Sequence, residues 1–358
     1  MEEKDKKQGC TKNRNKSSGK SMRIFLIVVC VLEALILAFL LFGTILLDDM
    51  FSKFGHDLYQ GGMSEDEYMQ NESNNPNING EEIDPDDIDW GDPAYQIGGG
   101  KDVINLLLIG QDRREGEGRA RSDSMILCTI NKKNKTVTMT SFMRDMYVQI
   151  PGYMDNRINA SYAFGGMELL NECLYVNFGI VVDGNIEVDF SGFQEVIELV
   201  GGIDIELSAA EARYLNKWGN WDVEDNAGEW SLVEGMNHLN GSQALAYSRI
   251  REVGNGDYGR TNRQRVVLTE LIEESKSMNL SQVRKLLNKI LPLLTTDLTN
   301  QEIFGLAMEL FPQISDYTIN TQQIPADGAH YGAFIREMAV LVPDLEKNRE
   351  ILAGIMAE

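Results

Sequence analysis

The chain has 358 residues, 43% of them hydrophobic and 25% charged, a composition that excludes a protein disordered throughout. Its formal net charge of −22 argues against broad electrostatic attraction to nucleic acid. The charge is unevenly distributed, because the first 23 residues contain eight basic and three acidic residues.

An almost wholly apolar run from Ile24 to Leu47 follows this basic tail. Its length suits one transmembrane helix, which needs roughly 20 apolar residues. A cleaved signal peptide would have a shorter apolar core, of about 7 to 15 residues, and a small-residue cleavage site. Because basic residues remain on the cytoplasmic side, we expect a single-pass protein of the cell membrane. Residues 1–23 would lie inside the cell, residues 24–47 would span the membrane and the remainder would lie outside.

Residues 48–100 are rich in Asn, Asp, Glu and Gly. Such a composition buries too little apolar surface to fold, and its like charges repel one another. It predicts a flexible, acidic linker outside the cell, followed by a folded domain over residues 101–358.

After residue 100 the pattern changes to alternating strands and helices. Short apolar runs predict strands at 103–109, 125–130, 136–142, 186–188, 203–205 and 317–324. Helical periodicity covers 166–175, 190–200, 209–218, 242–247, 260–276, 280–291 and 301–311. The turn from Asn131 to Asn134 predicts a hairpin between the second and third strands. Strands interleaved with covering helices predict a layered α/β domain.

The four cysteines do not form a disulfide framework. Cys10 and Cys30 fall in the predicted cytosolic tail and membrane span. Cys128 lies in an apolar run and Cys173 in a helical pattern, so we expect two buried thiols, with a bridge between them as the alternative.

Two aspartates at strand ends are candidate metal ligands. Asp112 follows one apolar strand and Asp123 precedes the next. Carboxylates from neighbouring elements are what Mg²⁺ typically takes from a protein, while phosphates and waters fill its other positions. The spacing alone favours the alternative, two surface aspartates that cap turns.

Arginines are concentrated near the same segments, and their planar guanidinium groups suit phosphate oxygens. In an extended segment Arg249 and Arg251 would point to one side. On a helix Arg260, Arg263 and Gln264 would fall on adjacent turns of one face. These residues predict a groove for a pyrophosphate, and the alternative is a set of exposed ion pairs with the plentiful acidic residues.

Seven short strings carry a specific resemblance. They are LLIGQDR (107–113), RSDSM (121–125), MRD (143–145), RINASY (157–162), VGGI (200–203), YSRIR (247–251) and DYGRTNRQ (257–264). In this order, behind an N-terminal anchor, they resemble the signature of the LytR-CpsA-Psr family within residues 105–264, which leaves 265–358 as a further part of the domain. Met143 departs from the signature, because the family usually has proline before Arg-Asp, and proline would stiffen that loop.

The resemblance implies a phosphotransferase that moves a glycopolymer phosphate from a polyprenyl pyrophosphate carrier to a peptidoglycan sugar hydroxyl. The polymer would be teichoic acid, capsule or another wall polysaccharide. Asp112 and Asp123 would bind Mg²⁺ or Mn²⁺, and with Arg144, Arg249 and Arg251 they would be the catalytic residues. The residues implied to hold the pyrophosphate are Arg121, Arg144, Arg157, Arg249, Arg251, Arg260, Arg263 and Gln264.

The resemblance also implies a sheet whose covering helices enclose a hydrophobic pocket for the polyprenyl chain. Apolar residues that would form its walls, or equally an ordinary core, are Phe190, Phe193, Val196, Ile197, Val266, Val267, Leu271, Ile272, Leu286, Leu287 and Ile290.

Other readings of the chemistry remain open. No histidine lies within a motif, so a Ser-His-Asp arrangement is not indicated and no covalent intermediate is required. Asp145 is a candidate base, although its arginine neighbours favour a role in orienting their side chains. The alternatives to the transferase are a regulator that binds polyprenyl phosphate without turnover and a lipid pyrophosphatase.

Overall fold

The computed structural model describes residues 55–56, 62–71, 74–97, 100–111, 121–218, 230–276, 278, 286 and 289–357. The predicted basic tail, the predicted membrane span and Asp112 lie outside the described residues. Within them, no helix is both long and apolar enough to cross a membrane.

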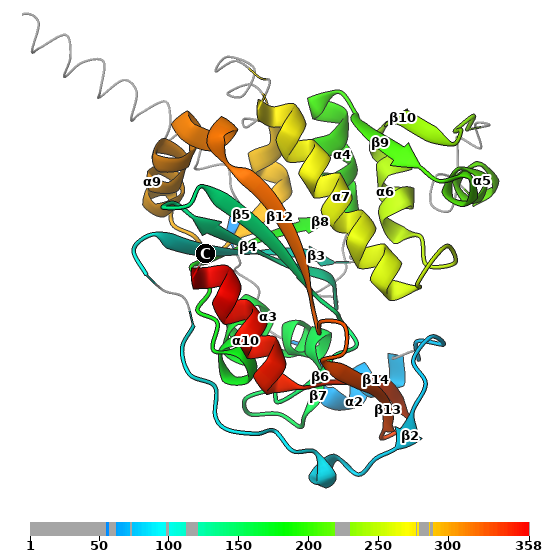
Figure 1. Cartoon of the computed structure of the whole chain (residues 1–358), viewed down its shortest axis with the longest axis vertical. Helices are drawn as coiled ribbons and strands as arrows, with labels where there is room; N and C mark the ends of the chain where they lie inside the picture. Colours follow the sequence, from blue (N-terminus) through cyan, green and yellow to red (C-terminus); the bar gives the residue numbers. More distant parts are fainter. Residues whose placement is uncertain are drawn as a thin grey trace, which may run out of the picture. The chain divides into compact units, whose positions relative to one another are not determined.

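A seven-stranded mixed sheet forms the centre of the fold (Figure 1), in the order β1-β11-β8-β3-β4-β5-β12. Its strands are β1 (Gly55–His56), β11 (Leu294–Thr296), β8 (Gly184–Asp189), β3 (Val103–Gln111), β4 (Ser122–Asn131), β5 (Thr136–Phe142) and β12 (Thr318–Ile324). The three strands β3, β4 and β5 pair antiparallel, while β8 runs parallel to β3 and β12 parallel to β5. The predicted hairpin is confirmed, because β4 pairs with β5 and the Asn131 side chain accepts hydrogen bonds from Lys133 N and Asn134 N in the turn.

Alternate side chains of β3 and β4 face two different cores, as the two-residue period of a strand requires. Leu107 and Leu127 are fully buried in a core shared with α3 (Ile158–Phe178) and α10 (Leu345–Ala357). Leu106 and Leu108 face the other side, where they are only partly buried against α7 (Asp257–Lys276) and α9 (Asn300–Leu310). Figure 1 shows α3 and α10 on one side of the sheet and α7 on the other. The predicted layered α/β architecture is confirmed.

A helical region packs around α7. It consists of α4 (Phe190–Val200), α5 (Ala209–Trp218), α6 (Gly241–Arg249) and the hairpin of β9 (Ile203–Leu207) with β10 (Gly235–Leu239). The first two helices begin and end at the predicted residues. For α4 the reason is local, because the Asp189 carboxylate accepts a hydrogen bond from Gly192 N at 2.8 Å and Gly201, at φ 100°, ends the helix. The strand predicted at 203–205 pairs only with β10 and stands apart from the main sheet.

Smaller elements complete the fold. A three-stranded sheet contains β14 (Met338–Pro343), β13 (His330–Ile335) and β2 (Glu81–Glu82), and a short ladder joins β6 (Tyr147–Val148) to β7 (Asn156–Arg157). Helix α2 (Glu65–Asn71) and the 3-10 turns η1 (Pro85–Asp87), η2 (Leu291–Leu293) and η3 (Phe311–Asp316) connect these parts. The helix predicted at 280–291 lies mostly outside the described residues. Cys128 and Cys173 are both buried and unbridged, as expected.

The prediction of a flexible linker through residue 100 is wrong for residues 62–71 and 74–97, which pack on the domain. Tyr68 of α2 is fully buried, donates its hydroxyl hydrogen bond to Asn159 Oδ1 at 2.9 Å and lies edge-on to Phe164. Ile97 N donates to Gly179 O at 2.8 Å, and β2 pairs with β13. A few apolar side chains anchor a segment whose average composition is that of a spacer.

Tyr68→Phe tests this packing. The ring stays in place, but the buried Asn159 oxygen loses its donor, so we expect the free energy of unfolding to fall by about 1–3 kcal/mol. Urea denaturation measures the change, and Tyr175→Phe is the control because Tyr175 is 46% exposed. Equal stability of the two variants would show that residues 62–71 do not belong to the folded domain.

Candidate functional site

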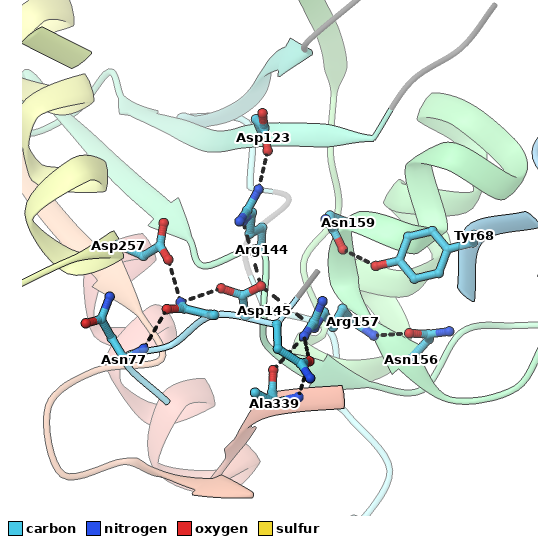
Figure 2. A network of polar contacts seen from close by, with 12 residues as sticks. Tyr68, Asn77, Asp123, Arg144, Asp145, Asn156, Arg157, Asn159, Asp257 and Ala339 are labelled. Carbon is cyan, nitrogen blue, oxygen red and sulfur yellow. Dashed lines mark hydrogen bonds and ion pairs between the residues drawn. The ribbon is translucent and has the colours of Figure 1, made fainter. Parts of the chain in front are cut away.

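Backbone topology brings the first site residues together. Asp123 is the second residue of β4, and Arg144 and Asp145 follow shortly after the end of β5. Because β4 and β5 are antiparallel, the start of one strand and the end of the other lie at the same end of the sheet. Figure 2 shows Arg144 between the two aspartates.

Two arginines flank the Asp123 carboxylate. Arg144 Nη1 lies 2.6 Å from Asp123 Oδ1, and Arg260 Nη1 lies 4.0 Å from the same oxygen. Burial alone would raise the pKa of Asp123, but the charges of Arg144 and Arg260 outweigh burial and lower it. The Asp123 side chain keeps 23% of its surface exposed. It is therefore an ionised carboxylate that is still open to a ligand.

Asp145 is the buried centre of the site, with 1% exposure. Its Oδ1 lies 3.7 Å from both Arg144 Nε and Arg157 Nε, and its Oδ2 accepts a hydrogen bond from Asn75 Nδ2 at 2.9 Å. This position fits the role of orienting arginine side chains that the sequence favoured over that of a base.

Arg157 is fully buried, and its hydrogen bonds connect parts of the wall of the site. Its Nη2 donates to Ala339 O at 2.8 Å and to Asn74 Oδ1 at 3.1 Å, and Asn74 Oδ1 also accepts from Ala339 N. Arg157 therefore joins β14 and the segment after α2 to Asp145 (Figure 2). Its burial does not favour the predicted direct contact with a pyrophosphate.

The first turn of α7 supplies the third carboxylate. Asp257 Oδ1 lies 3.0 Å from Arg260 Nε and 3.3 Å from Arg251 Nε, while its Oδ2 accepts a hydrogen bond from Asn75. Asp257 and Arg260 face each other because residues three apart lie on one side of a helix. Burial and the nearby Arg144 lower the pKa of Arg260 to about 10, so it remains protonated at neutral pH. The Arg251 side chain is 41% exposed and faces solvent.

The other predicted phosphate ligands have different surroundings. Arg249 is the last residue of helix α6, not part of an extended segment, and its guanidinium lies 4.6 Å from the centroid of the Phe190 ring. Gln264 Oε1 is buried without a hydrogen-bond partner among the described residues. Arg121 directly precedes β4, and thus lies next in the chain to Ser122 and Asp123.

Arg263 does not join the arginines of the site. Its Nε donates to Glu211 at 2.7 Å, while Nη1 and Nη2 donate to Ile250 O and Val253 O at 3.1 and 2.7 Å. The predicted pyrophosphate role of Arg263 is therefore not supported, because these bonds engage each nitrogen of its guanidinium. Arg263 instead holds the loop that carries Arg251.

The charges of the cluster favour an anion. Its positive charges outnumber its negative charges, because four arginines are paired with three carboxylates. The arginines are Arg144, Arg157, Arg251 and Arg260, and the carboxylates are those of Asp123, Asp145 and Asp257. No group of three or more acidic, histidine or cysteine side chains that could hold a metal occurs in the described part of the chain. Asp123 can supply one ionised oxygen ligand, and its predicted partner Asp112 lies outside the described residues.

Sequence reasoning missed three residues of this site. Asp257 was visible inside the last motif but was not chosen. Asn74 and Asn75 lie in a stretch that reads as a spacer, and no local signal distinguishes them from the surrounding asparagines. Their amides link segments that are far apart in the chain, so only the fold reveals their role.

Comparison with known proteins places this arrangement in a family. A sequence profile of the LytR_cpsA_psr family matches residues 57–353. The chain belongs to the LytR-CpsA-Psr family. The resemblance seen in the seven motifs is thus confirmed, and the match begins inside the stretch that had been predicted to be a linker.

Several members of the LytR-CpsA-Psr family are similar over most of the domain. The polyisoprenyl-teichoic acid–peptidoglycan teichoic acid transferase TagU of Bacillus mycoides is 33% identical over 230 residues, which are 63% of this chain and 69% of TagU. The structure of TagT bound to LIIa-WTA has a TM-score of 0.59 at 27% identity, with coverage of 72% of this chain and 92% of that one. TagT (YwtF) with bound octaprenyl pyrophosphate has a TM-score of 0.55, the same identity and the same coverage.

Met143 is where this chain departs from the LytR-CpsA-Psr motif. Its backbone N–H donates to Ile324 O at 2.8 Å, and its sulfur accepts from Gln323 Nε2 at 3.5 Å. A proline would stiffen the loop but has no N–H to donate. In this chain a hydrogen bond to the last residue of β12 fixes the loop of Arg144 instead.

Arg157→Met tests the wall of the site. Removing one partner of a buried ion pair leaves the other charge uncompensated, which typically costs about 3–5 kcal/mol. We expect such a loss in the free energy of unfolding for Arg157→Met, measured by chemical denaturation. Arg213→Met on the exposed surface of α5 is the matched control and should change stability little. If the two variants were equally stable, Arg157 would not support the site.

Proposed function

We propose that this chain transfers a glycopolymer phosphate from a polyprenyl pyrophosphate carrier to a sugar hydroxyl of peptidoglycan. The observation that carries the proposal is the cluster in which Arg144, Arg251 and Arg260 surround the open Asp123 carboxylate and the buried Asp257. The names of TagU and of TagT with its bound octaprenyl pyrophosphate support the same substrate class.

The arginines neutralise and align the pyrophosphate. The wall hydroxyl forms a bond to the phosphorus nearest the polymer, and the bond from that phosphorus to the bridging oxygen breaks. Polyprenyl phosphate leaves with the electron pair, and the hydroxyl proton is released to water. Asp257 holds Arg251 at the solvent side of the site, and the buried Arg260 and Arg144 are held in advance by Asp257 and Asp123. Such preorganised charges are a large part of catalysis in phosphoryl transfer.

The proposal includes a divalent cation at the open side of this cluster. Asp123 is ionised and partly exposed, and Asp112 directly follows β3, which pairs with the start of β4. Asp112 and Asp123 would hold Mg²⁺ or Mn²⁺, which neutralises phosphate charge when it is bound.

The face of the sheet beneath α7 and α9 is the proposed site of the polyprenyl chain. On the opposite face Leu107, Ile109 and Leu127 are at most 1% exposed, which leaves no room for a ligand. Beneath α7 and α9, a buried cluster is surrounded by apolar side chains that are only partly buried, which are Leu106, Leu108, Leu268, Ile272, Leu306, Leu310 and Ile319. Apolar surface with this incomplete packing suits an isoprenoid chain.

The proposed function also includes the membrane topology expected from the sequence. A span at residues 24–47 with the basic tail inside the cell would place residues 48–358 on the side where peptidoglycan is assembled.

Transfer of a labelled, lipid-linked polymer to peptidoglycan tests the function. Loss of a preorganised donor costs about 10²–10³-fold in rate, so Arg251→Ala should slow formation of the polymer–wall bond by that factor. Asp123→Asn should lower the rate more strongly, and excess Mg²⁺ should partly rescue this variant alone. Arg213→Ala on α5 is the control and should transfer at the normal rate.

The products separate the transferase from its alternatives. A wild-type protein that binds the lipid but forms no bond to peptidoglycan would be a binding regulator. Release of free polymer phosphate without wall attachment would identify a pyrophosphatase. If Asp123→Asn transferred polymer at the normal rate, the metal-assisted mechanism would be wrong.

A further inference from the structure

A pocket of about 420 Å³ lies next to the arginine cluster. Asn75 and Asp257 belong to both, since they line the pocket and also contact Asp145, Arg251 and Arg260. The remaining walls come from the segment after α2, the loop before α7, and strands β13 and β14. The pocket therefore adjoins the proposed phosphate site. It has space for a second group of the substrate.

The lining of the pocket is rich in neutral amides. Asn77, Asn79 and Asn255 are exposed at its walls, and their side-chain amides make no hydrogen bond within the described part of the chain. Figure 2 shows Asn77 near Asp257, with its side-chain amide outside the bonded network. An amide both donates and accepts hydrogen bonds, as do the hydroxyl and acetamido groups of a sugar.

The charge of the pocket disfavours a phosphate. Among the residues that the structure describes around it, none is Lys or Arg, and Asp257 contributes a carboxylate. The site thus has two parts. The cationic cluster suits phosphate, and the amide-lined pocket suits an uncharged polar ring.

Two glycines allow close contacts in the walls of the pocket. Gly256 has φ 58°, and a Cβ there would lie 2.5 Å from Asn77 Nδ2. A Cβ on Gly332 would lie 2.3 Å from Asn79 O. Side chains at these two positions would push the asparagines aside, so glycine preserves the shape of the pocket.

Tyr258 and His330 form a fixed polar pair in the wall. Their Oη and Nε2 atoms are 2.6 Å apart, and His330 Nδ1 lies 3.1 Å from Ala326 O. Because a carbonyl oxygen only accepts, Nδ1 carries a proton, and in the neutral imidazole Nε2 accepts from the Tyr258 hydroxyl. The Tyr258 oxygen is thereby left to accept a hydrogen bond from a ligand.

We propose that the pocket lined by Asn77, Asn255 and Tyr258 binds a neutral, N-acetylated sugar ring beside the reacting phosphate. The inference rests on the proposed function, in which the new bond joins a peptidoglycan sugar to a glycopolymer. The ring belongs either to the peptidoglycan acceptor or to the first sugar of the donor polymer, and the experiment below distinguishes these sources.

The test is the double variant Asn77→Ala/Asn255→Ala. Each lost hydrogen bond is worth about 1 kcal/mol, and tenfold corresponds to about 1.4 kcal/mol, so the KM of one substrate should rise about 10- to 30-fold with little change in kcat. A higher KM for peptidoglycan assigns the pocket to the acceptor, and a higher KM for the lipid-linked polymer assigns it to the donor. Asn134→Ala in the β4–β5 turn is the matched control, since that turn lies at the opposite end of β4 from Asp123.

Direct binding separates this inference from the proposed function. Saturation-transfer NMR with an uncrosslinked disaccharide-peptide fragment of peptidoglycan, and with the polymer's first disaccharide, requires no turnover. Binding to the wild type that the double variant loses would support the pocket even if no transfer occurred. Normal KM values in the double variant, together with unchanged binding of both probes, would overturn the inference while leaving the transferase intact.

Discussion

The site depends on one buried carboxylate, that of Asp145. Taking such a charge out of water is costly unless it is paired and hydrogen-bonded, and Arg144, Arg157 and Asn75 provide these contacts. Its backbone oxygen also accepts from Leu341 N at 2.9 Å, which ties it to β14. Asp145 therefore joins the loop after β5 to parts of the chain that come long before and long after it. Through these contacts it fixes the positions of the Arg144 and Arg157 guanidinium groups.

The arginines around Asp145 differ in their exposure to solvent, and therefore in their access to a ligand. Arg157 is sealed inside the wall, Arg144 and Arg260 are mostly buried beside Asp123, and Arg251 reaches solvent. An anion entering from the open side would thus meet the exposed Arg251 before the buried Arg144 and Arg260. The amide-lined pocket begins where this cationic surface ends, which separates the recognition of phosphate from that of sugar within one continuous site.

Elements with a clear local signal were predictable from the sequence, and elements defined by distant partners were not. Helix α4 matched its prediction because a capping aspartate and a terminal glycine mark its ends. The helix predicted from Gly166 is present, but a further helical segment precedes it from Ile158, and the two meet at Gly166, whose φ of 67° and ψ of −150° are not helical. At the site, the motifs indicated Asp123, Arg144, Arg251 and Arg260 correctly as neighbours. They could not show that Arg263 binds Glu211, or that Asn75 joins two carboxylates, because both contacts arise only from the fold.

A crystal structure of the protein with a bound polyprenyl pyrophosphate would test the central claim most directly. The account predicts phosphate oxygens within hydrogen-bond distance of the guanidinium groups of Arg144, Arg251 and Arg260, with the isoprenoid chain on the sheet face beneath α7 and α9. A pyrophosphate bound elsewhere, with the contacts among these arginines and Asp123 and Asp257 unchanged, would contradict it.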